Sequence, residues 1–191
     1  MKRITLVLVL VTLAGCVSAP PERSYYLLRA EVPNDLAAAP PDAAAGLGLI
    51  QVAAYLDRAG VVIGVGENQV REARFHLWAE PLDRGIRIYL SDRIASQLGY
   101  RLETGPGSVG PIRYRIDVSV EEFHGALDGE TKLVARWSVR DLEDDSLTLS
   151  RRFSKKSRQS GDGYASLVQS QLALLDDFAA EIAQALTDLN Q

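Results

Sequence analysis

The side chains that most often perform catalysis or bind metals are few and scattered in this chain of 191 residues. Only two histidines occur, His76 and His124, and Glu80 is the carboxylate best placed to act with one of them. A catalytic triad or a zinc site needs a cluster of such groups. His76 and Glu80 flank an expected strand end and helix start, so their side chains need not converge. We therefore expect no metal, no cofactor and no enzymatic activity.

Paired carboxylates and a glycine-rich segment do not change this expectation. Glu121 and Glu122 are adjacent, so in an extended strand they should point to opposite faces. Residues 105–110 match G-x-G-x-x-G, but they follow an expected helix and lead into an expected strand, the reverse of a dinucleotide site. Pro106 also removes an amide and breaks the G-x-S-x-G pattern around Ser108. A plain turn is the favoured interpretation.

The only cysteine, Cys16, has the surroundings of a lipid attachment site. Lys2 and Arg3 precede an uncharged apolar run at residues 4–13, which is shorter than the roughly 20 residues that span a bilayer. Small residues directly precede Cys16, as in the lipobox of bacterial lipoproteins, where the sulfur is diacylglycerated and the new amino terminus is acylated. We expect residues 1–15 to be a signal peptide and Cys16 to bear the acyl chains, palmitate among them.

Two or three acyl chains hold a protein stably on a membrane, whereas one holds it only marginally. An Asp directly after the cysteine would favour retention at the inner membrane, and Val17 occupies that position. We therefore expect the periplasmic face of the outer membrane, with contact to its lipid through acylated Cys16. Residues 16–24 contain Pro20 and Pro21 and form the expected tether.

Residues 25–191 are enough for one domain with its own core. The net charge of −4 becomes more negative by two when the signal peptide removes Lys2 and Arg3. Such an acidic balance gives no indication of nucleic-acid binding. Without a second cysteine there is no disulfide framework, so packing must hold the fold together.

Hydrophobic periodicity predicts an α+β fold. One helix should begin at Pro81 and stop at Gly99, and a second should run from about 163 to 189. Alternating or compact apolar runs predict strands at residues 25–28, 49–53, 61–63, 69–76, 112–120, 133–139 and 147–153. These elements indicate a mixed, largely antiparallel sheet with two main helices packed on it, an α/β sandwich preceded by the signal peptide.

One concentrated basic segment stands out on this acidic chain. It consists of Arg151, Arg152, Lys155, Lys156 and Arg158. It could meet anionic lipid headgroups or an acidic partner surface. The alternative is that its charges protect an edge strand from aggregation.

Four motifs in order along the chain resemble the ABC-type transport auxiliary lipoproteins, the PqiC-like family. They are Tyr25-Tyr26-Leu27-Leu28, Tyr55-Leu56-Asp57-Arg58, Trp78-Ala79-Glu80-Pro81-Leu82 and Tyr164-Ala165-Ser166-Leu167-Val168. The resemblance covers nearly all of the chain after Cys16, and the Trp-Ala-Glu-Pro-Leu element is its most specific part.

The resemblance implies a non-enzymatic docking component of an intermembrane lipid transport system. Its partner would be an MCE-domain protein that spans the periplasm, with an ABC transporter complex contacted indirectly and a homo-oligomeric ring as one form of assembly. Partner-binding candidates are Trp78, Tyr25, Tyr26, Arg151, Arg152, Lys155 and Lys156. For Trp78, packing at the helix start is the favoured interpretation over a partner contact, and Tyr25 and Tyr26 should point to opposite faces. Alternatives are a lipoprotein that supports the envelope structurally and a periplasmic hydrolase.

Overall fold

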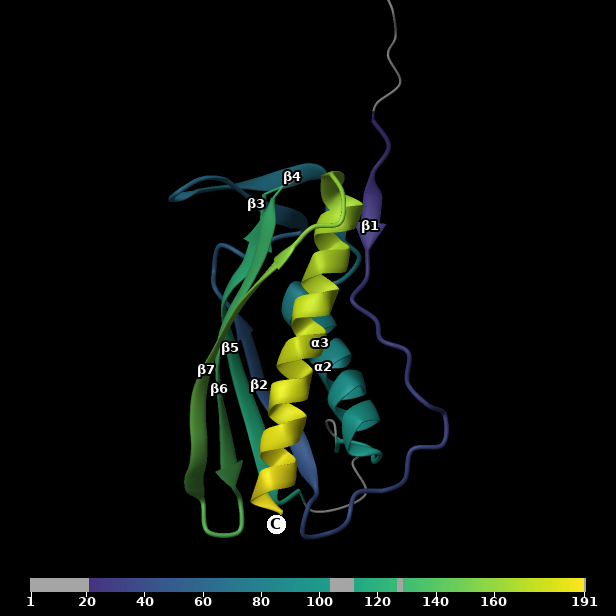
Figure 1. Ribbon diagram of the computed structural model, residues 1–191, viewed down its shortest axis with the longest axis vertical. Coiled ribbons are helices and arrows are strands. Elements are labelled where there is room, and N and C mark those ends of the chain that lie inside the picture. The colour runs from purple at the N-terminus through teal and green to yellow at the C-terminus, as the bar shows by residue number, and fades with distance from the viewer. Residues whose placement is uncertain (1–20, 104–111, 127–128, 191) are drawn as a thin grey trace, which may run out of the picture.

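The computed structural model describes residues 21–103, 112–126 and 129–190. The expected signal peptide, Cys16 and the glycine-rich segment 105–110 lie outside this range. Two helices lie on one side of a seven-stranded sheet (Figure 1). The elements in chain order are β1 (Ser24–Tyr26), β2 (Ala45–Val52), β3 (Gly60–Gly66), β4 (Gln69–Trp78), α2 (Leu82–Leu98), β5 (Tyr114–Gly125), β6 (Glu130–Asp141), β7 (Ser146–Arg158) and α3 (Gly163–Leu189).

The sheet is mixed and largely antiparallel, which confirms the expected α+β fold. Its order is β1-β4-β3-β5-β6-β7, with β2 also paired to β5. The β3–β4, β5–β6 and β6–β7 pairs are antiparallel, whereas β1–β4 and β2–β5 are parallel. One edge of β5 is shared, because β2 pairs with it as far as Val120 and β3 joins it at Gly125. The loop that follows β2 lies where the neighbour of β5 changes from β2 to β3.

A bulge in β5 changes which face its side chains occupy. The register against β6 shifts between Val120 and Glu122, so Glu121 is the extra residue. Val120 and Phe123 are therefore both buried although they are three residues apart. The expectation that Glu121 and Glu122 point to opposite faces is wrong for this reason, since both carboxylates pair with cations on the face away from the helices.

Helix α3 lies along the length of the sheet and α2 lies beside it (Figure 1). Pro81 is the residue before α2, with ψ 134°, so the helix begins one residue later than expected. Gly99 ends it at φ 76°, as expected. Fully buried side chains between α3 and the sheet include Phe123, Leu133, Trp137, Leu175 and Phe178.

No helix in the described ranges has both the length and the apolar character needed to cross a membrane.

Candidate functional site

The four family motifs come together where β1, β4 and the first turns of both helices meet. Tyr26 and Trp78 are register partners in the β1–β4 pair. The Tyr26 hydroxyl is 3.0 Å from Nδ1 of His76, and the His76 ring stacks on Tyr164 at the start of α3 with centroids 3.9 Å apart. The second motif joins them through its turn, because the Trp78 amide donates to the Ala59 carbonyl. We call this region the motif junction.

Trp78 lies inside the junction and not on its surface. Its side chain is 7% exposed and stacks on Phe123 of β5, with centroids 6.4 Å apart and an interplanar angle of 22°. This burial leaves little of the indole for a partner to touch. The packing alternative for Trp78 accounts for its contacts, since the ring joins β4 to the strand at the centre of the sheet.

Glu80 fastens the start of α2 to the chain that leaves β1. Its Oε1 accepts a hydrogen bond from Arg29 at 2.5 Å, and its Oε2 lies 3.7 Å from Arg84. The hydrogen bond from Arg29 is the main reason that the pKa of Glu80 falls below its ordinary value. The Ala79 amide also donates to the Tyr26 carbonyl. The described chain therefore enters the fold through a strand bound to a helix start.

The two adjacent tyrosines of β1 have different environments. Tyr25 is 59% exposed, while Tyr26 is half-buried against His76. Burial raises the pKa of Tyr26 above its ordinary value. β1 is an edge strand, so Tyr25 is the tyrosine that a partner can reach.

The basic segment of β7 does not form a single patch. Arg152 and Lys156 oppose Arg136 and Lys132 in the register, on the face away from the helices, where they pair with Glu121 and Glu130. Lys155 lies on the other face and pairs with Asp177 of α3 at 2.8 Å. Arg151 opposes buried Trp137 on that same face and is exposed. Alternation along the strand thus divides the charges, and three of the four predicted residues already have acidic neighbours.

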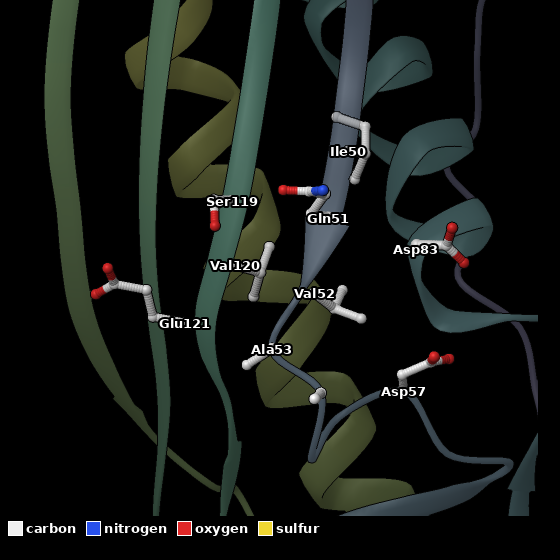
Figure 2. A pocket seen from close by; sticks show the side chains of 10 residues that line it. Ile50, Gln51, Val52, Ala53, Asp57, Asp83, Ser119, Val120 and Glu121 are labelled. Atoms are coloured by element: carbon white, nitrogen blue, oxygen red, sulfur yellow. The ribbon is translucent and has the colours of Figure 1, made fainter.

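A cavity of about 590 Å³ opens where β2 separates from β5. Figure 2 shows Asp57 and Asp83 on one side of it and Glu121 on the other, with Gln51 and Ser119 between them. Glu121 is held by Arg136 at 2.6 Å. Ser119 has no histidine among the residues that line the cavity, so the lining offers no nucleophile–base pair.

The histidines fill structural positions in this part of the molecule. His124 stacks edge-on against Tyr55, and its Nε2 is 3.8 Å from Glu122. Burial lowers the pKa of His124 below its ordinary value, so the ring is neutral at neutral pH. Within the described ranges, no three His, Cys, Asp or Glu side chains come together as a metal site would require. His76, which sequence reasoning left without a role, is the link between Tyr26 and Tyr164.

The profile of the ABC-type transport auxiliary lipoprotein component family matches residues 25–183. The chain belongs to this family. Two relatives named Intermembrane transport lipoprotein PqiC, from Escherichia coli (strain K12) and Shigella flexneri, are each 28% identical over 195 residues, covering 99% of this chain and all of the relative. The family assignment made from the four motifs is thus confirmed.

Solved structures share the fold of this family member. A crystal structure of an uncharacterized protein, 28% identical, superposes with a TM-score of 0.72 over 87% of this chain and 99% of its own. Protein XCC0632 from Xanthomonas campestris, 12% identical, has a TM-score of 0.66 over 84% of this chain and 92% of its own. At that identity the second likeness speaks for the fold alone.

Proposed function

We propose that this protein is an outer-membrane-anchored docking component of an intermembrane lipid transport system and that it has no catalytic role. The family match over residues 25–183 carries the proposal, because it covers the motif junction, α2 and most of α3. Its relatives named Intermembrane transport lipoprotein PqiC align over their whole length. The chain is therefore an auxiliary lipoprotein of intermembrane transport.

Residues 1–15 are removed as a signal peptide, and the acylated Cys16 is the anchor. Residues 16–24 are the tether that joins the anchor to a single domain, residues 25–191. The described chain enters at β1, which is bound to the start of α2 through Arg29 and Glu80. A pull on the tether would therefore act on a strand that is joined to the core by hydrogen bonds and by an ion pair. This arrangement suits a component held between a membrane and a partner.

An MCE-domain protein that spans the periplasm is the proposed partner, with the ABC transporter contacted through it. Tyr25 and Arg151 are the exposed members of the predicted interface set that have no ion-pair or aromatic partner among the described residues. Tyr25 offers a large amphipathic ring on an edge strand, a residue type enriched at interfaces.

The test is to extract membranes in mild detergent, capture the tagged lipoprotein and identify what accompanies it by mass spectrometry. Co-purification of an MCE-domain protein from wild-type cells is expected, with its loss in Cys16→Ser, which should leave the outer-membrane fraction. Recovery alone, or with peptidoglycan-associated proteins only, would contradict the docking role and favour a structural role in the envelope.

A Tyr25→Ala variant sharpens the capture experiment. Because Tyr25 is exposed, its loss should weaken capture without lowering the stability of the fold. Leu147→Ala, which removes a 57% exposed side chain at the start of β7, is the matched control and should leave capture unchanged. Equal capture by both variants would remove Tyr25 from the interface.

A further inference from the structure

The β3–β4 hairpin presents apolar side chains at its tip. Val65 and Val70 are 47% and 46% exposed on either side of the turn that contains Glu67 and Asn68. Val70 opposes Gly64, so no larger side chain shields it across the ladder. These two valines lie at one end of the molecule, where water or an adjoining surface must cover them.

Three cations and Glu130 line a groove beside Val65. A cavity of about 750 Å³ is bounded by Ile63 and Val65 of the hairpin and by Arg71, Lys132 and Lys156. Lys132 and Lys156 pair with Glu122 and Glu130, at 2.9 and 3.3 Å, while Arg71 forms no ion pair within the described ranges. An apolar rim next to cations on a protein of net charge −4 favours an amphipathic anion as the neighbour.

The groove and the hairpin tip lie at the end of the molecule where the chain enters. In Figure 1 the chain reaches β1 from the same end at which β3, β4 and the last residues of β5 lie. The turn at the other end of the long axis, between β6 and β7, is acidic, with Glu143, Asp144 and Asp145. The hairpin end carries Arg71 and Glu67, whereas the opposite turn carries three acids, so the opposite end is the more acidic one and would face away from an anionic surface.

The length of the tether limits how far this end can be from the membrane. Ser24 lies eight positions after Cys16, and each step adds at most about 3.6 Å when the chain is fully extended. Acylated Cys16 would thus keep β1 within roughly 30 Å of the bilayer surface. The hairpin and the groove belong to the part of the fold that this tether holds nearest to the lipid.

We propose that Val65, Arg71, Lys132 and Lys156 form a tether-end surface that contacts the anionic phospholipid headgroups of the membrane, while Val70 lies on the other face of the hairpin tip. Arg71 meets a lipid phosphate, and Val65 contacts the region where headgroups and acyl chains adjoin. This proposal rests on the proposed anchoring, which places the surface beside the lipid.

The experiment uses the full lipoprotein with a fluorophore attached to Asn68→Cys in the hairpin turn. Leu147→Cys, at the start of β7 beside the β6–β7 turn, is the matched control. Both proteins are mixed with excess vesicles of phosphatidylcholine containing phosphatidylglycerol and headgroup-spin-labelled lipid. We expect strong quenching at residue 68 and little at residue 147, with the difference lost in vesicles of phosphatidylcholine alone. Arg71→Gln should lower about fivefold the preference of the surface for vesicles with phosphatidylglycerol over vesicles of phosphatidylcholine alone, which is the effect of one cation near a membrane surface.

Two readouts separate the tether-end surface from the anchor. Anchoring is reported by co-flotation with vesicles and by the number of fluorophores per protein. That number is one in an anchored protein, because acylation consumes the Cys16 thiol and leaves only the introduced cysteine to be labelled. A protein that floats and shows equal quenching at residues 68 and 147 overturns the proposed surface while the anchor stands. Two fluorophores per protein without flotation would refute the proposed anchor. Absence of quenching at residue 68 in that protein would overturn the tether-end surface as well. Circular dichroism of each variant confirms that the fold is kept.

Discussion

Replacing Trp78 by Ala separates its packing role from a partner-binding role. The indole is 7% exposed and stacks on Phe123, so its removal leaves a cavity between β4 and β5. Truncation of a buried aromatic side chain to Ala typically costs about 3–5 kcal/mol. For a protein of this size, that loss corresponds to a melting temperature lower by roughly 6–20 °C.

The assay is urea and thermal unfolding of the detergent-solubilised lipoprotein, followed by far-ultraviolet circular dichroism. Tyr25→Ala is the control, because its 59% exposed side chain should contribute no more than about 0.5 kcal/mol. Trp78→Phe should recover part of the lost stability, since a smaller ring still fills much of the space. A free energy of unfolding within about 1 kcal/mol of wild type for Trp78→Ala, combined with loss of partner capture, would refute the packing account.

Four further substitutions test individual features of the fold. Glu80→Gln should lower the free energy of unfolding by about 0.5–1 kcal/mol at neutral pH. Because Arg29 lowers the pKa of Glu80, the extra stability of the wild type is present above the ordinary pKa of 4.5 and is lost as the pH falls below it. Unfolding measured as a function of pH would show this loss. Gly99→Ala should lower stability by about 1–2 kcal/mol in urea unfolding, because φ is 76° although nothing lies within 4 Å; a neutral result would contradict that backbone argument. Tyr89→Phe and Asp176→Ala remove the two ends of a 2.8 Å hydrogen bond between the helices, and a double-mutant cycle should give a coupling energy of about 0.5–3 kcal/mol, while full additivity would show no interaction.

Patterns with a local cause could be predicted from the sequence. The last helix occupies residues 163–189 as expected because its apolar face repeats over many turns. Gly99 ends α2 in the left-handed conformation because few other residues adopt it readily. The extra residue in β5 also leaves a trace in the sequence, since apolar Val120 and Phe123 break the alternation of the strand.

The contacts that build the motif junction have no such local cause. His76 joins Tyr26 to Tyr164 across two long sequence separations, and a single sequence does not show which residues meet. The division of the basic segment, in contrast, follows from strand alternation: Arg151 and Arg152 are adjacent and must occupy opposite faces. Grouping these charges as one patch overlooked that rule.

The most direct test of the transport role is genetic. Cells lacking this gene, cells lacking the MCE-domain partner and cells lacking both are compared for survival in detergent. The account predicts the same sensitivity in all three strains, because one route is interrupted in each. A double mutant with clearly greater sensitivity than either single mutant would show two independent contributions and would contradict a shared intermembrane transport function.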